Sequence, residues 1–305
     1  MRNFVSSPKK TLILGTRGSL LARTQSEWVA EKLRAAHPGI EILLKIVQTS
    51  GDMNRDVPFN QVGTKGMFVK EIEEALLDGS IDLGVHSLKD MPGDLPDGLE
   101  IVCTPPRENP CDSLLTTSGL ALKHLPEHAI VGTSSIRRQV QLKAIRPDLD
   151  IHELRGNLDT RWRKLEEGRY DAIMLACSGL NRLGWGDRIT ENLNPQSFVP
   201  AAGQGALAIE TRVGDFEVSS LLSAIHDEDT FCAVSAERAF LAELGGGCSI
   251  PAGAFAEISG AEIHLIGMFA NVSNGRMQRV KLTGSREDPI QLGKAAAQQL
   301  SREMS

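Results

Sequence analysis

The sequence of 305 residues has few aromatic residues, a single tyrosine and no long apolar run. Aromatic residues make up 4% of the chain, which argues against stacking as the main mode of ligand binding. Acidic residues outnumber basic ones and give a formal net charge of −6, which argues against nucleic acid or an anionic membrane surface as the partner. No stretch approaches the apolar length of a membrane-spanning helix. An anion site in this chain must therefore be a local concentration of arginine and lysine.

The five cysteines are odd in number, scattered along the chain, and form no CxxC pair. The apolar run at residues 11–14 is too short for a secretory signal, so we expect reduced thiols and a cytoplasmic protein. The seven histidines show no HExxH or other metal-ligand spacing, and we expect no metal site.

The first two-thirds of the chain alternates short apolar runs with longer amphipathic ones, which predicts α/β units with mainly parallel sheets. Strands are predicted at residues 11–15, 40–47, 81–86, 129–131, 151–154 and 172–175. A helix is predicted after Ser19, which suits an N-cap, and ends at residues 37–39, His-Pro-Gly. A further helix is predicted at residues 68–77.

The last part of the chain has a different pattern. A helix is predicted at residues 229–244, ended by Gly245, followed by an antiparallel sheet at 253–258, 262–269 and 278–282 and a final helix at 289–304. The pattern therefore predicts a separate α+β domain from about residue 224. The polar, aperiodic segment 49–66 fits a functional lid and an ordinary surface loop equally well.

Three predicted strand-to-helix junctions carry arginines. Arg17 enters the first predicted helix; the other four junction arginines are Arg137, Arg138, Arg155 and Arg161. A helix N-terminus already carries partial positive charge, so arginine there is unfavourable unless an anion compensates it. One such junction is explained by a surface ion pair, but three together favour a site for several carboxylates or phosphates at the carboxyl ends of the strands.

Two further residues are candidates for chemistry. Asp90 follows a predicted strand in VHSLKDMP and could stabilise a developing cation or relay a proton, although a turn or capping role before proline explains it as well. Cys248 follows three consecutive glycines, which leave a thiol accessible as a nucleophile, although a lone cysteine is usually structural. No histidine lies near it in sequence, so a cysteine hydrolase is not supported.

Eight segments in order resemble the signatures of the porphobilinogen deaminase (hydroxymethylbilane synthase) family, over nearly the whole chain. They are TRGSLLARTQ (16–25), VGTKGMFVKE (62–71), DLGVHSLKDMP (82–92), VGTSSIRRQ (131–139), LRGNLDTR (154–161), YDAIMLACSGLNRLG (170–184), VPAAGQGALAIE (199–210) and LGGGCSIPAGAFA (244–256).

The resemblance implies an α/β fold of two periplasmic-binding-protein-like (type II) α/β domains plus a small α+β C-terminal domain. Domain 1 would be discontinuous, at residues 1–105 and 206–223, with domain 2 at 106–205 and domain 3 at 224–305. The alternation of strands and helices alone does not indicate that return of the chain to domain 1.

The resemblance also implies a transferase that condenses four porphobilinogen molecules, with loss of ammonia, on a covalent dipyrromethane cofactor and then hydrolyses the product to hydroxymethylbilane. Cys248 matches the cysteine that carries the cofactor through a thioether. Asp90 matches the catalytic aspartate, expected to interact with pyrrole nitrogens and stabilise the azafulvene-type cation. The resemblance implies that cofactor and substrate are bound by Arg17, Ser19, Lys89, Ser135, Arg137, Arg138, Arg155, Gly156, Arg161, Arg182 and Gln204. It also implies a mobile loop that contains Lys65 and Phe68.

The family pattern implies a monomer in haem biosynthesis that passes its product to uroporphyrinogen-III synthase. The chain departs from the pattern at 108–112, where Glu-Asn-Pro-Cys-Asp has Cys111 in place of the usual arginine. A solute-binding protein for a small polycarboxylate could use the same arginines, but it needs an export signal and has no use for the thiol of Cys248.

Overall fold

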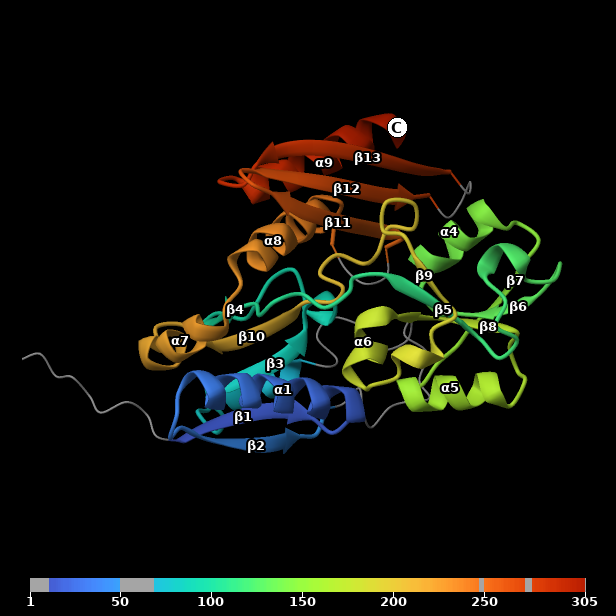
Figure 1. Ribbon diagram of the computed structural model, residues 1–305. Helices are drawn as coiled ribbons and strands as arrows, with labels where there is room; N and C mark the ends of the chain where they lie inside the picture. Colours follow the sequence, from blue (N-terminus) through green and yellow to red (C-terminus); the bar gives the residue numbers. More distant parts are fainter. Residues whose placement is uncertain (1–10, 50–68, 247–249, 272–275, 305) are drawn as a thin grey trace, which may run out of the picture. The chain divides into compact units, whose positions relative to one another are not determined.

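The computed structural model describes residues 11–49, 69–246, 250–271 and 276–304. The chain forms two compact units (Figure 1). The first unit consists of Met1–His86, Asp94–Pro106 and Leu207–Asp227, and the second of Ser87–Gly93, Arg107–Ala206 and Glu228–Ser305. Both units are therefore discontinuous in sequence.

The first unit contains a five-stranded sheet in the order β2-β1-β3-β10-β4. Strand β1 pairs in parallel with β2 and β3, whereas β10 pairs antiparallel with β4. Helix α1 begins after Ser19, whose hydroxyl accepts a hydrogen bond from the Ala22 N–H, and its C-cap is His37, as predicted. The elements are β1 (Thr11–Arg17), α1 (Leu20–Ala36), β2 (Glu41–Val47), α3 (Lys70–Leu77), β3 (Leu83–Ser87), β4 (Leu99–Cys103), β10 (Leu207–Arg212), α7 (Phe216–Leu222) and the short 3-10 helix η4 (Ser223–Ile225).

The second unit contains another five-stranded sheet, in the order β7-β6-β8-β5-β9. Strand β6 is parallel to β7 and β8, so these strands have their carboxyl ends at one edge of the sheet, and β5 is antiparallel to β8 and β9. The elements are β5 (Asp112–Thr116), β6 (Ile130–Gly132), α4 (Ile136–Ile145), β7 (Asp150–His152), α5 (Leu158–Glu166), β8 (Ala172–Ala176), α6 (Cys177–Arg182) and β9 (Glu191–Leu193), with the 3-10 helices η1 (Leu88–Asp90), η2 (Leu122–His124) and η3 (Gly186–Arg188).

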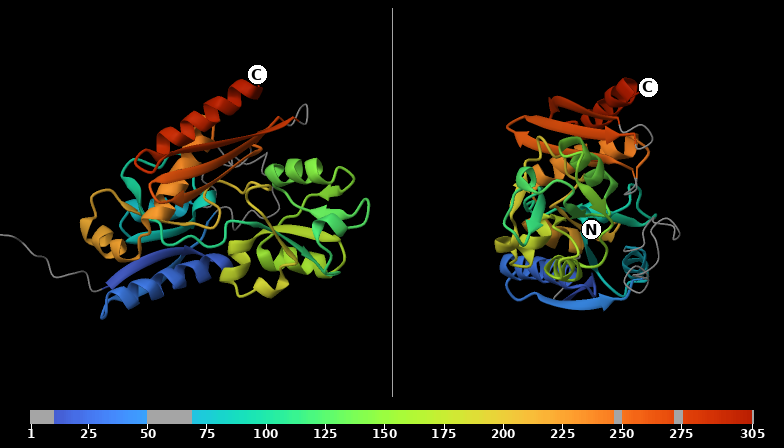
Figure 2. Two further views of the ribbon diagram at one scale, coloured as in Figure 1. Left: turned by 45° about the horizontal axis from the view of Figure 1, so that its top comes forward. Right: turned by 90° about the vertical axis from the view of Figure 1, so that its right-hand side faces the viewer.

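The C-terminal part of the second unit is an antiparallel sheet with two helices on it (Figure 2). Its elements are α8 (Glu228–Glu243), β11 (Ala252–Ser259), β12 (Glu262–Ala270), β13 (Met277–Ser285) and α9 (Pro289–Met304). Phe240 of α8 is fully buried and packs on β12 at Gly267, where an added Cβ would lie 2.3 Å from the phenyl ring. The helix lies this close to the sheet because position 267 has no side chain.

The two five-stranded sheets share one strand order. The fourth strand of the first sheet, β10, follows residues 200–206, and the fourth strand of the second sheet, β5, follows residues 104–111. These two segments connect the two units in sequence. The local patterns predicted the other described strands but not β4, β5, β9 or β10. Two α/β sheets and a small sheet-plus-helix portion confirm the predicted fold class, and the three domain boundaries stay a prediction.

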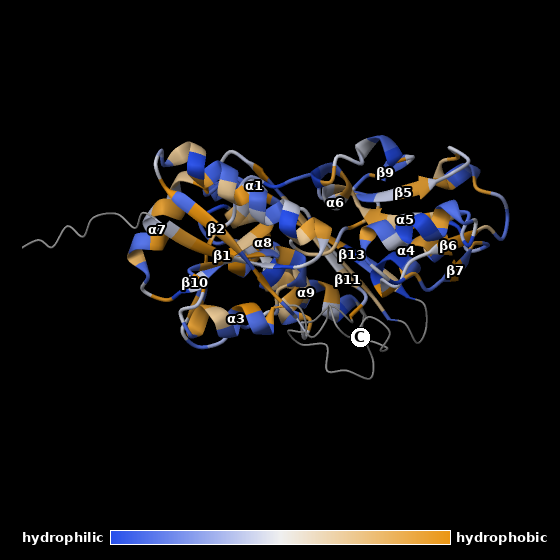
Figure 3. Ribbon diagram, turned by 90° about the horizontal axis from the view of Figure 1, so that it is seen from below, coloured by the Kyte–Doolittle hydropathy of each residue, from blue (hydrophilic) through white to orange (hydrophobic). Residues whose placement is uncertain are grey.

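Helix α5 is largely hydrophilic in Figure 3, and Leu165 is its buried residue. None of the described helices is long and apolar enough to cross a membrane.

Candidate active site

Asp90 lies at the end of a short 3-10 turn, η1, that directly follows strand β3. The turn is held by buried Leu88, whose N–H donates to the Ala206 carbonyl at 3.0 Å. Leu88 also fills the space at Gly203, where an added Cβ would lie 3.0 Å from its Cγ. Lys89 is partly buried, whereas Asp90 is exposed. The fold therefore presents the Asp90 carboxylate from a fixed turn.

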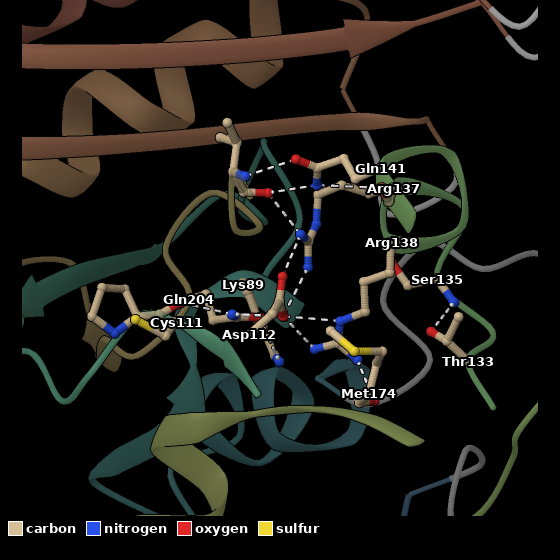
Figure 4. A network of polar contacts seen from close by, with 12 residues as sticks. Lys89, Cys111, Asp112, Thr133, Ser135, Arg137, Arg138, Gln141, Met174 and Gln204 are labelled. Carbon is tan, nitrogen blue, oxygen red and sulfur yellow. Dashed lines mark hydrogen bonds and ion pairs between the residues drawn. The ribbon is translucent and has the colours of Figure 1, made fainter. Parts of the chain in front are cut away.

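Arg137 and Arg138 lie in the first turn of α4 and converge on one carboxylate, Asp112 at the start of β5 (Figure 4). Arg137 donates from its two terminal nitrogens to both Asp112 oxygens, at 2.6 and 3.2 Å. Arg138 donates from Nε to Asp112 Oδ1 at 2.9 Å, and its Nη2 lies 2.7 Å from the same oxygen. Backbone carbonyls of Val199 and Met174 accept further bonds from the two arginines. The anion that compensates arginine at this helix N-terminus is Asp112.

The Asp112 carboxylate is completely buried and remains charged. Burial by itself would raise the pKa of Asp112, but the charges of Arg137 and Arg138, with hydrogen bonds from Arg137 and Gln204, hold that pKa well below its usual range. A carboxylate that is completely buried stays ionised only where several charged donors bind it, as the two arginines do here.

Gln204 connects Asp112 to Lys89 (Figure 4). Its amide nitrogen donates to Asp112 Oδ1 at 3.0 Å, and its amide oxygen accepts a bond from Lys89 Nζ at 3.4 Å. Burial lowers the pKa of Lys89 to about 8, as do the charges of Arg138 and Arg137, against the opposing charges of Asp90 and Asp112. Lys89 therefore loses its proton just above neutral pH.

The junction after β7 contains Arg155, Gly156 and Arg161, three of the predicted residues. Arg155 donates to Glu153 at 2.7 Å, the surface ion pair that explains a single such junction. Arg161 donates from Nε to the Gly156 carbonyl at 2.7 Å, and its terminal nitrogens have no hydrogen-bond partner among the described residues. Burial and the charge of Arg138 lower the pKa of Arg161 to about 10, while Asp90 opposes the shift. Arg161 and Asp90 therefore act on each other.

The remaining predicted residues are dispersed. Arg182 donates to the Gly205 carbonyl at 2.7 Å, and burial lowers its pKa to about 10. Ser135 is the N-cap of α4 but makes no side-chain capping bond. Arg17 and Ser19 belong to the first unit, where the Ser19 hydroxyl caps α1. Lys65, Phe68 and Cys248, and with them most of the segment 49–66, lie outside the described residues.

The sequence patterns missed two buried carboxylates that organise this region. One is Asp112; the other is Glu237 of α8, which accepts two bonds from Arg107, at 2.6 and 3.0 Å, and the backbone N–H groups of Gly203 and Ala256. Both have 0% exposure. An acidic residue two positions before the apolar pair Leu114-Leu115 is the local signal for Asp112, and it does not reveal the partners.

The second unit therefore gathers more positive than negative charge around Asp90. The electrostatically coupled set consists of Lys89, Arg137, Arg138 and Arg161 against Asp90 and Asp112. The excess of cations and the unused N–H groups of Arg161 suit a ligand with several carboxylates. Among the described residues no group of three or more His, Cys, Asp or Glu could hold a metal ion.

Comparison with known proteins identifies the family to which the sequence is similar. Residues 12–220 match the family described as "Porphobilinogen deaminase, dipyromethane cofactor binding domain", and residues 231–302 match "Porphobilinogen deaminase, C-terminal domain". The chain is 48% identical over 292 residues to the porphobilinogen deaminase of Roseiflexus castenholzii, covering 96% of both chains. It is 46% identical over 291 residues to that of Syntrophobacter fumaroxidans, covering 95% of this chain and 94% of the other.

Some solved structures match this chain weakly. A methionine-binding lipoprotein of Bacillus subtilis, described as putative, is 14% identical, with a TM-score of 0.43 over 72% of this chain and 92% of that one. That likeness says nothing about function. The two family matches, which together span almost the whole sequence, and relatives at nearly half identity show that this chain belongs to the porphobilinogen deaminase family, an enzyme family of tetrapyrrole synthesis with a dipyrromethane cofactor.

Proposed function

We propose that this chain is a transferase that condenses four porphobilinogen molecules, with loss of ammonia, on a dipyrromethane attached to Cys248, and releases hydroxymethylbilane by hydrolysis. The observation that carries the proposal is the placement of exposed Asp90 beside a buried excess of cations, in a chain of this family. Porphobilinogen and dipyrromethane both carry carboxylates, so an arginine- and lysine-rich site fits them.

Asp90 is the proposed catalytic residue. Its carboxylate is exposed at the end of a fixed turn, where Lys89 and Arg161 act on it electrostatically. A carboxylate there stabilises positive charge on the substrate nitrogen as ammonia leaves, and its oxygens can accept the pyrrole N–H proton.

The cationic residues bind and orient the carboxylates. When bound, the dipyrromethane supplies the free pyrrole α-carbon at which the chain grows, and Cys248 anchors it. The residues proposed to bind or surround these carboxylates are Arg17, Ser19, Lys89, Ser135, Arg137, Arg138, Arg155, Gly156, Arg161, Arg182 and Gln204, with Lys65 and Phe68 in a mobile loop.

The wider setting is proposed on the family alone. The chain would act as a cytoplasmic monomer in haem biosynthesis and pass its product to uroporphyrinogen-III synthase. Domain 1 would comprise residues 1–105 and 206–223, domain 2 residues 106–205, and domain 3 residues 224–305.

Intact-protein mass tests the cofactor attachment. The purified active chain is expected to exceed its sequence mass by one two-pyrrole unit, and Cys248→Ser is expected to remove that increment. Cys232→Ser is the matched control, because the Cys232 thiol donates to the Arg286 carbonyl, a bond that a hydroxyl can keep. An unmodified mass for active protein would refute the proposal.

Turnover tests the role of Asp90. Asp90→Asn is expected to keep the mass increment and to lose product formation by at least about 100-fold. Asp97→Asn replaces another exposed aspartate nearby in sequence and is expected to retain activity. Normal product formation by Asp90→Asn would disprove the assigned role.

A further inference from the structure

We infer that Asp112 is a positioning residue for this reaction: its buried carboxylate holds Arg137 and Arg138 in the orientation in which they meet the carboxylates of the ligand, and it holds buried Gln204 against Lys89. This inference rests on the proposed function. Asp112 itself is completely buried and would touch neither substrate nor cofactor.

The donors of the two arginines show how the positioning works. A guanidinium has five N–H groups. Arg137 contacts both Asp112 oxygens and the Val199 carbonyl, and Arg138 contacts Asp112 and the Met174 carbonyl. These contacts fix each planar group and still leave N–H groups on it for a ligand. Without the carboxylate, two cations side by side would repel each other and lose these orientations.

The identity of the partners separates Asp112 from an ordinary buried ion pair. Glu237 is buried as completely, but its partners are Arg107 and two backbone N–H groups, none of them proposed to meet the ligand. All the side-chain donors of Asp112, by contrast, belong to the proposed binding set. Asp112 thus serves ligand binding as well as the fold.

The same contacts extend to Lys89, which precedes Asp90. Gln204 donates to Asp112 and accepts from Lys89, at 3.0 and 3.4 Å. The charges that act on Lys89 are Asp90 beside it, Arg137 and Arg138 on α4, and Asp112 on β5. The pKa of Lys89 is about 8, and the Asp112 charge raises it, so removing that charge moves the Lys89 pKa further down.

The pH dependence of Asp112→Asn tests the inference. Lys89 must be protonated to attract carboxylates, so kcat/KM for porphobilinogen falls on the alkaline side as Lys89 deprotonates. In Asp112→Asn this alkaline limb is expected about one pH unit lower, with KM raised about 10-fold or more. Asp112→Glu, which restores the charge, is expected to return the limb toward its original pH.

Cofactor loading gives a readout that needs no turnover. The fraction of purified chain with the two-pyrrole mass increment is expected to drop by more than half in Asp112→Asn. Asp148→Asn is the matched control: it breaks the Arg146–Asp148 pair in the same unit and is expected to leave loading and the alkaline limb unchanged. An unchanged limb, KM and loading in folded Asp112→Asn would overturn the inference.

A second variant covers the case in which Asp112→Asn does not fold. The double variant Asp112→Asn/Arg137→Gln removes one charge of each sign, so that of the two buried arginines only Arg138 is left without the Asp112 carboxylate. We expect it to fold with a higher KM and a lower cofactor loading than Arg137→Gln alone, which keeps Asp112, and equal values in these two variants would contradict the inference. If the wild-type chain itself consumes no porphobilinogen, the proposed function fails instead, and the two failures are thus distinguishable.

Discussion

Each five-stranded sheet has a buried carboxylate on its fourth strand, but the two carboxylates differ in their hydrogen bonds. Asp112 lies on β5 and Glu210 on β10, each the fourth strand of its sheet, and both have 0% exposure. Asp112 accepts bonds from two arginines and a glutamine. Glu210 lies 3.1 Å from His86 Nε2, and its oxygens have no hydrogen-bond partner among the described residues.

The difference has consequences for pH dependence. The pKa of Asp112 is lowered, so its stabilisation is present above the unfolded value and is lost as the pH falls through the native one. Glu73, a buried neighbour of Glu210 on α3, has a raised pKa because of burial and the Glu210 charge, partly offset by His86. Its contribution changes in the opposite direction, because stability falls as the pH rises from the unfolded value to the raised one. Acid therefore weakens the Asp112 network and favours the Glu73 site.

The largest expected effect is on the free energy of unfolding when each carboxylate is neutralised. Asp112→Asn leaves Arg137 and Arg138 buried without their counter-ion and is expected to cost about 3–5 kcal/mol. Glu210→Gln replaces a buried carboxylate whose oxygens have no hydrogen-bond partner among the described residues, and its effect is expected to stay within about 1 kcal/mol. Urea denaturation at neutral pH measures both.

An equal loss of unfolding free energy in Asp112→Asn and Glu210→Gln would contradict the comparison. Glu243→Gln serves as the surface control, since Glu243 is exposed and accepts one bond, from Gln298. We expect that substitution to leave the denaturation midpoint nearly unchanged.

The comparison also shows how far the sequence leads. Ser19 is predictable as an N-cap because the signal is local: a hydroxyl residue directly before an amphipathic run. Arg137 and Arg138 were recognised as unusual at a helix start, but the compensating Asp112 is 25 residues away from Arg137 and comes from another strand. Strand β10 was missed because the four other strands of its sheet all lie before residue 107, on the far side of a segment that belongs to the second unit; β5, by contrast, lies in one continuous segment with the other strands of its sheet. Family signatures supplied what local patterns could not, namely the chain's return and the cofactor.

An intermediate effect is expected at Glu73, and it depends on pH. Glu73→Gln is expected to stabilise the chain by about 1 kcal/mol at neutral pH, because a carboxylate with a raised pKa is costly to keep ionised in a buried site. The gain should shrink as the pH falls, because protonation of the wild-type carboxylate removes its buried charge. Thermal or urea unfolding across a range of pH, with Glu31→Gln at an exposed position of α1 as the control, measures it. A gain that grows toward acid pH would reverse the assigned sign.

The smallest expected effect is on the reactivity of Cys111, next to Asp112. Burial raises the pKa of the Cys111 thiol, as do the neighbouring Cys177 and Asp112. In Asp112→Asn the third cause is gone, so more thiolate forms and alkylation of Cys111 by iodoacetamide should accelerate a few-fold near pH 8. Cys103 in the first unit is the internal reference, because burial raises its pKa to about 12 and no Asp112 charge acts on it. Peptide mass spectrometry of folded protein gives both rates. If Cys111 and Cys103 kept their wild-type ratio, Asp112 would not carry the negative charge that Arg137 and Arg138 compensate.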